Sequence, residues 1–118
     1  LNIDSNEIDK IEENAFKNLA NLKSLYLNFN NIKSLECGVF NGLFNLIELV
    51  LNNNFDINFI KRLNETNEIK SYLKNLPTGL FTDFNKLQIL EIHNNRIKKL
   101  EENVFVNLNN LKRLDLSG

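Results

Sequence analysis

The sequence predicts a solenoid of stacked coils, each carrying one short parallel strand. The 118 residues include 21 leucines and 24 asparagines. Asparagine is a poor former of helix and strand interiors, so its abundance requires an architecture that uses it systematically. Leucine, asparagine and phenylalanine also recur with a period of 24 residues, and such a period is the signature of a repeat architecture.

The repeat follows the pattern LxxLxLxxNxIxxLxxxxFxxLxx. A block that opens at Leu22 is followed 24 residues later by one at Leu46, and blocks that open at Leu87 and Leu111 are again 24 residues apart. Residues 1–21 fit the same frame, which gives three full and two partial repeats. Because both ends of such a stack leave leucine-rich faces uncovered, we expect residues 1–118 to be one segment of a longer solenoid.

One block is longer than the others. The interval from Leu46 to Leu87 is 41 residues, so an insertion lies at about residues 55–72. We expect this insertion to form a loop with one helical turn resting on the core. It contains Asn64-Glu65-Thr66, an acceptor sequence for N-glycosylation. Asn64 is therefore a candidate glycan site, with chance occurrence in an asparagine-rich chain as the alternative.

Within each block, the residue types predict a coil with a buried interior. Leu25 and Leu27 alternate with polar neighbours, as in a short strand with one buried face. The asparagine after each strand has donors and acceptors for the backbone of neighbouring coils, and stacked phenylalanines should fill the outer part of the core. These asparagines are Asn6, Asn30, Asn54 and Asn95, and the phenylalanines are Phe16, Phe40, Phe81 and Phe105.

These residues resemble the leucine-rich repeat family, specifically its 24-residue extracellular-type class. That class includes Toll-like receptors, Slit-like guidance proteins and small leucine-rich proteoglycans. The resemblance covers nearly the whole chain except the insertion, and it implies an α/β solenoid with an irregular or 3₁₀ outer face. It is specific for the fold and uninformative about function, because unrelated receptors, inhibitors and matrix proteins share the repeat.

The strand face, which is concave in such a solenoid, carries the candidate binding residues. Several of its outward positions are apolar where a pure stacking unit needs polar residues, and tyrosine is a common interface anchor. Scattered surface apolar residues are the alternative interpretation. The candidate partner-binding residues are Tyr26, Phe29, Val50, Ile89, Glu91, His93 and Arg113.

No residue pattern indicates a catalytic, metal or cofactor site. One cysteine and one histidine exclude an internal disulfide and the common zinc sites, and His93 has no recognisable nucleophile partner. We therefore predict no catalytic residue, metal or cofactor. Cys37 lies on the outer turn among polar neighbours. Its exposed thiol is free or paired with a cysteine of another region or another chain, with oxidation or lipid attachment as the remaining alternative.

The predicted function is non-enzymatic recognition of a protein partner, as part of an extracellular or cell-surface receptor, adhesion or immune-type protein. A net charge of −1 gives no electrostatic footprint for nucleic acid or for an anionic membrane. We therefore expect no nucleic-acid partner, no small-molecule substrate, and membrane contact only through regions outside this chain. The alternatives are a cytoplasmic scaffold with an accidental glycosylation triplet, or a structural component of a filament or assembly that self-associates.

Overall fold

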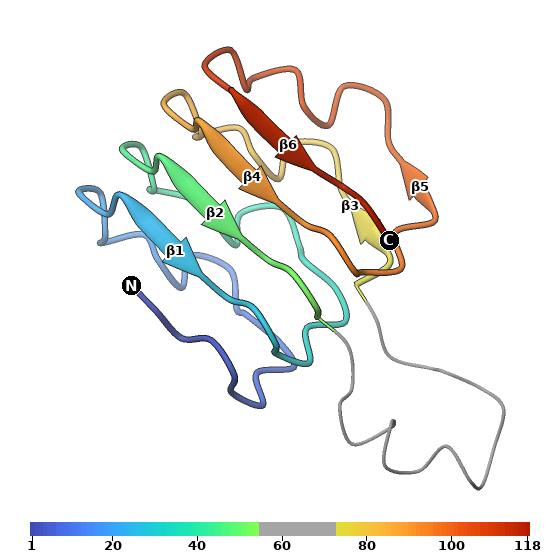
Figure 1. The fold of residues 1–118 in the computed structure, drawn as a ribbon. Helices are drawn as coiled ribbons and strands as arrows, with labels where there is room; N and C mark the ends of the chain where they lie inside the picture. Colours follow the sequence, from blue (N-terminus) through green and yellow to red (C-terminus); the bar gives the residue numbers. More distant parts are fainter. Residues whose placement is uncertain (55–72) are drawn as a thin grey trace, which may run out of the picture.

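The computed structural model of the protein describes residues 1–54 and 73–118. The predicted insertion at about residues 55–72, including Asn64, lies outside this range. The described strands are β1 (Ser24–Tyr26), β2 (Glu48–Val50), β3 (Asn75–Leu76), β4 (Ile89–Glu91), β5 (Lys99–Leu100) and β6 (Arg113–Asp115). Figure 1 shows the chain winding through successive coils whose front strands lie side by side.

The main sheet has the strand order β1-β2-β4-β6, and all of its pairs are parallel. The central leucines are in register, with Leu25 opposite Leu49, Leu49 opposite Leu90, and Leu90 opposite Leu114. The first coil joins through a parallel bridge between Asn2 and Tyr26. The long block therefore changes neither the direction nor the register of the sheet, and the predicted solenoid is confirmed.

The outer side of each coil is built from tight turns. In the first coil, for example, the backbone N–H of Leu19 donates to the carbonyl of Phe16 and that of Leu22 donates to the carbonyl of Leu19, both at 2.9 Å. Two later coils add a small second sheet, in which β3 pairs in parallel with β5. We did not predict this sheet, because the sequences of β3 and β5 show no alternation of apolar and polar residues. Among the described residues, no helix is long and apolar enough to cross a membrane.

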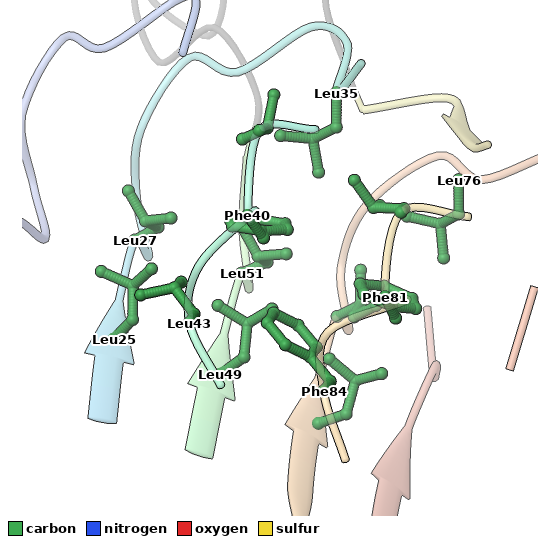
Figure 2. Packing of buried hydrophobic residues seen from close by; sticks show 14 of the residues in the cluster. Leu25, Leu27, Leu35, Phe40, Leu43, Leu49, Leu51, Leu76, Phe81 and Phe84 are labelled. Atoms are coloured by element: carbon green, nitrogen blue, oxygen red, sulfur yellow. The ribbon is translucent and has the colours of Figure 1, made fainter. Parts of the chain in front are cut away.

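Leucine and phenylalanine fill the interior of the coils (Figure 2). The predicted phenylalanine stack is present: the ring centroids of Phe16 and Phe40 lie 6.1 Å apart, as do those of Phe81 and Phe105. Phe84 joins the two pairs, because its ring lies 5.6 Å from both Phe40 and Phe81. The other coils have leucine at the position of Phe84, so its part in the stack was not predicted.

The asparagine ladder is also present. Asn30, Asn54 and Asn95 are buried, at 2%, 0% and 5% exposure. The side-chain N–H groups of Asn54 donate to the carbonyls of Leu27, in the preceding coil, at 3.1 Å and of Leu51 at 2.8 Å. Its Oδ1 accepts from the backbone N–H of Ile32 at 3.3 Å. Asn30 and Asn95 repeat this arrangement one coil earlier and one coil later. Each buried asparagine therefore ties its own turn to the preceding coil.

Two positions of the repeat have left-handed backbone geometry in every described coil. One lies on the outer turn, and the other directly follows the end of the strand. The outer-turn residues are Asn14, Gly38, Gly79 and Asn103, and the strand-exit residues are Ser5, Phe29, Asn53, Asn94 and Gly118, all with positive φ. Asparagine and glycine tolerate this region best. The left-handed positions therefore account for part of the asparagine content that the buried ladder does not explain.

Gly42 has a further constraint, because it lies against the backbone of the preceding coil. Its φ is +87°, and a Cβ placed there lies 2.6 Å from the carbonyl oxygen of Lys17. Gly79 has a similar φ of +86°, but the nearest atom to its added Cβ is Thr82 Oγ1 at 3.6 Å. The two glycines share one conformational cost and differ in the space around them.

We therefore expect Gly42→Ala to lower the free energy of unfolding by about 1–3 kcal/mol more than Gly79→Ala does. The additional loss comes from the displacement of one coil against the next. Urea unfolding of the two variants measures it. Equal losses in both variants would mean that positive φ alone sets the cost at Gly42.

Candidate protein-binding face

The outward residues of the main sheet form two rows in the register of the strands. Each strand directs its central leucine inward, and the residues on either side of it face outward. One row contains Asn2, Tyr26, Val50, Glu91 and Asp115, and the other contains Ser24, Glu48, Ile89 and Arg113. The sheet therefore brings Tyr26, Val50, Ile89, Glu91 and Arg113 onto one surface. Phe29 and His93 follow β1 and β4 at the strand exits.

Val50 does not form part of the exposed surface. Only 6% of it is exposed, although we predicted an accessible apolar contact there. Its neighbours in the register are Tyr26 and Glu91, and their long side chains shield a short valine between them. Val50 is therefore a buried component of the face, and it cannot supply contact area without movement of its neighbours.

Tyr26 is half-buried, and its hydroxyl has a partner within the sheet. The hydroxyl donates a hydrogen bond of 2.6 Å to Glu48 Oε2 on the adjacent strand. This bond to a carboxylate stabilises the neutral phenol, which raises the pKa of Tyr26. The ring of Tyr26 is therefore held in one place over the sheet, and a fixed aromatic side chain loses little conformational entropy on binding.

Glu91 is also fixed by its neighbours. Arg113 Nη2 lies 3.0 Å from Glu91 Oε1, and the Asn52 side-chain N–H donates to Glu91 Oε2 at 3.1 Å. Both carboxylate oxygens are therefore occupied. Asp115, the next residue in the row, accepts two hydrogen bonds from Ser117, and these bonds lower the pKa of Asp115. Two predicted contact residues, Glu91 and Arg113, are thus paired with each other, and Asn52 also holds Glu91.

A second ladder of side chains runs along the strand exits. The side-chain oxygen of Asp4 accepts from the backbone N–H of Asn28 at 2.8 Å, that of Asn28 accepts from Asn52 at 3.0 Å, and that of Asn52 accepts from His93 at 2.9 Å. Of these residues only His93 was predicted to be a contact residue of the face, and the ladder itself was not predicted. The signal was present, because Asp or Asn occupies one repeat position in three consecutive coils.

Phe29 differs from the rest of the face in both exposure and backbone geometry. It is 53% exposed and has a φ of 52°. The equivalent residues in the other coils are serine, asparagine or glycine, which tolerate left-handed geometry better than a bulky side chain does. Of the other predicted contact residues, Ile89 and His93 are half-buried and Arg113 is exposed.

The remaining candidate sites lie away from the strand face or outside the described residues. Cys37 is an exposed free cysteine, and its thiol lies 3.0 Å from the carbonyl oxygen of Thr78, to which it donates. Asn64 belongs to the range that the structure does not describe. In residues 1–54 and 73–118, no three His, Cys, Asp or Glu residues gather in a way that could hold a metal ion.

Comparison with known proteins identifies a family and several related proteins that match this sequence. A family model described as "Leucine rich repeat" matches residues 1–55 and 70–118. The chain is 33% identical to Keratocan of Gallus gallus over 118 residues, covering 98% of this chain and 28% of that protein. It is also 33% identical to Toll-like receptor 7 of Mus musculus over 119 residues, covering all of this chain and 10% of that protein. The chain thus spans less than a third of the length of either relative.

One solved structure is also similar to this chain. The chain superposes on a structure titled "Crystal structure of TLR13-ssRNA13 complex" with a TM-score of 0.56 and 30% sequence identity. The superposition covers 94% of this chain and 17% of the other. The similarity therefore extends over nearly all of the coils described above.

Proposed function

Because the chain belongs to the leucine-rich repeat family, we propose that it recognises a protein partner through its strand face and carries out no chemistry. The family alone does not decide this, since one repeat fold serves many functions. The support comes from the residues that face outward from the sheet. These are ordered side chains with a mixed apolar and charged character, as protein interfaces have.

The observation that carries the proposal is Phe29. A bulky residue at positive φ is a genuine outlier, and strained positions of this kind cluster at functional sites. Burial of the Phe29 side chain does not offset this backbone strain, since 53% of the residue is exposed. Neither the backbone nor the core therefore explains phenylalanine at a position that asparagine or serine fills in other coils.

Other residues of the strand face complete the proposed interface. Tyr26 provides a fixed aromatic ring on the same coil, and half-buried Ile89 adds apolar area on β4, which β2 separates from β1. Glu48, Glu91, His93 and Arg113 form the polar surroundings. An apolar centre with a polar rim is the usual anatomy of a protein-binding hot spot. Val50 is omitted from this set because it is buried.

The expectation that nucleic acid is not a partner has no support from the comparisons, because one similar structure is titled as a complex with ssRNA. We favour a protein partner on the charges of the face itself. The described strand rows carry the carboxylates of Glu48, Glu91 and Asp115 and the single guanidinium of Arg113. A face with this balance repels a phosphate backbone, whose binding requires an excess of lysine and arginine.

We also propose that the protein acts outside the cell or at its surface, as part of a longer solenoid. Similarity to a protein named a receptor supports the location, as does the acceptor triplet at Asn64. The chain covers 28% of Keratocan and 10% of Toll-like receptor 7, and the greater length of these relatives supports a longer stack. The cytoplasmic scaffold and the self-associating assembly remain the alternatives. Peptide mass mapping of the protein from its native source tests glycosylation at Asn64.

Phe29→Asn tests the binding face. We expect this variant to gain roughly 1 kcal/mol in the free energy of unfolding, because asparagine relieves the strain at positive φ. We expect it to bind the partner roughly tenfold or more weakly, because the aromatic anchor is lost. The wild-type chain first identifies a partner in a panel of secreted and cell-surface ectodomains. Surface plasmon resonance then compares the variants.

Phe44→Asn is the matched control, because Phe44 is 51% exposed and lies on the turn before β2, away from the strand exits. It should leave affinity unchanged. A partner that binds Phe29→Asn normally and Phe44→Asn weakly would move the interface off the strand face. A loss of stability in Phe29→Asn would show that Phe29 packs within the fold.

A further inference from the structure

Lysine occupies the same repeat position on three consecutive coils, on a side of the solenoid separate from the strand face. We name Lys33, Lys74 and Lys98 the lysine row. Lys74 and Lys98 directly precede β3 and β5, and Figure 1 shows β3 and β5 apart from the main sheet. All three lysines are exposed. The row therefore runs along the stacking direction of the coils and shares no residue with the candidate protein-binding face.

The backbone holds the row together. The N–H of Lys98 donates to the carbonyl of Lys74 at 3.2 Å, and the next residues, Asn75 and Lys99, are partners in the β3–β5 pair. Neighbouring strands lie about 5 Å apart, so the Lys74 and Lys98 side chains leave the backbone at that spacing. Cys37 Sγ, which donates to the carbonyl of Thr78 at 3.0 Å, links the coil of Lys33 to the coil of Lys74.

Among the described residues, no carboxylate forms an ion pair with a lysine of the row. The ion pairs found in residues 1–54 and 73–118 are Lys10–Glu12, Lys99–Glu101 and Arg113–Glu91, and none involves a lysine of the row. The nearest acidic neighbours by position are Asp9, Glu36 and Glu101. Asp9 continues the row on the first coil, Glu36 follows Lys33 by three residues, and Glu101 follows Lys98 by three residues and pairs with Lys99. Like charges at adjacent strand positions repel, so this arrangement costs free energy in the absence of an anion.

Positive charge is also segregated along the solenoid. Residues 1–54 contain four Lys or Arg and seven Asp or Glu, whereas residues 73–118 contain seven Lys or Arg and five Asp or Glu. A chain with a net charge of −1 attracts a polyanion only through such a local excess. Two of the three lysines of the row, together with the neighbouring Lys99 and Arg96, belong to the basic half.

We propose that the lysine row binds a sulfated polysaccharide. Such a chain carries anionic groups at regular intervals along its length, and the row offers point charges at regular intervals along the coils. Lysine suits an anion bound as a point charge, whereas bidentate recognition favours arginine. Single-stranded nucleic acid is a weaker fit, because its bases stack on aromatic side chains. The row and its neighbours Ser34, Asn75 and Lys99 contain no aromatic residue.

The test uses the full chain and a size-defined heparin oligosaccharide as the probe. The row variant replaces Lys33, Lys74 and Lys98 with serine. The control variant replaces Lys17, Lys23 and Lys112 with serine, which removes the same charge from exposed positions outside the row. Titration calorimetry across a series of NaCl concentrations gives the affinity and its salt dependence, and thermal unfolding by circular dichroism verifies that both variants fold.

We expect the row variant to bind roughly tenfold or more weakly and with a shallower salt dependence, because fewer counterions are released. The control variant should stay within about twofold of the wild type, since distant exposed charges are largely screened. Equal losses in both variants would overturn the proposal in favour of general charge attraction, as would the absence of wild-type binding at physiological salt. Tighter binding of a single-stranded oligonucleotide, or of an acidic peptide, with the same dependence on the row would overturn the ligand class. Each of these results leaves the strand-face proposal untouched.

Discussion

We expect Phe40→Ala to lower the free energy of unfolding by about 3–5 kcal/mol. Phe40 is 1% exposed, and its ring centroid lies 6.1 Å from that of Phe16 and 5.6 Å from that of Phe84. Removing the ring leaves a cavity in the middle of the phenylalanine stack, where coils on both sides lose contacts at once. Urea unfolding followed by circular dichroism measures the change.

Phe44→Ala serves as the control for this prediction, because Phe44 lies four residues away and is 51% exposed. Its replacement should change stability by about 0.5 kcal/mol or less. A similar loss in the two variants would contradict the assignment of Phe40 to the stack. Phe105→Ala should cost less than Phe40→Ala, since Phe105 is only partly buried at the end of the stack.

Asn54→Ala should lower the free energy of unfolding by about 2–4 kcal/mol. The substitution leaves the buried backbone N–H of Ile32 without its side-chain acceptor. The carbonyl groups of Leu27 and Leu51 each accept from two asparagine side chains, and each loses one of these two donors. These carbonyls retain a bond from Asn30 or Asn95, so the orphaned N–H dominates the cost. The same unfolding measurement determines it.

Asn6→Ala tests the same repeat position without burial. Asn6 is exposed, and its side chain donates within its own turn, to the carbonyls of Ile3 and Asp4. We expect a change of about 0.5 kcal/mol or less. A wild-type melting temperature for Asn54→Ala, or a large loss for Asn6→Ala, would show that the ladder does not stabilise the coils through buried hydrogen bonds.

The sequence predicted the stacking frame because burial in this fold is periodic. A leucine at one repeat position has the same surroundings in every coil, so Leu25, Leu49 and Leu90 each indicate the same buried row. The buried asparagines follow the same logic. A polar residue recurring at a fixed distance from buried leucines needs partners in the adjacent coils, and Asn30 and Asn95 have them.

Features that depend on the side chains of the neighbouring coil, rather than on the repeat pattern, could not be predicted from the sequence. Val50 alternates correctly for an outward residue, yet its burial depends on the side-chain lengths of Tyr26 and Glu91 across the sheet. Phe84 joins the aromatic stack from a leucine position, which only the three-dimensional spacing reveals. The φ of Phe29 is likewise invisible in a pattern of apolar and polar residues. The binding roles of Tyr26, Ile89, His93 and Arg113 stay predictions.

The register between β2 and β4 has a consequence for protein engineering. Val50 pairs with Glu91 as directly as Tyr26 pairs with Val50, although 41 residues separate the first pair and 24 the second. The alignment of the sheet therefore does not depend on chain length between Asn54 and Leu73, and loop-closure entropy changes slowly with length. We expect that a foreign epitope or a protease site could be grafted into this interval with the spacing of the coils unchanged.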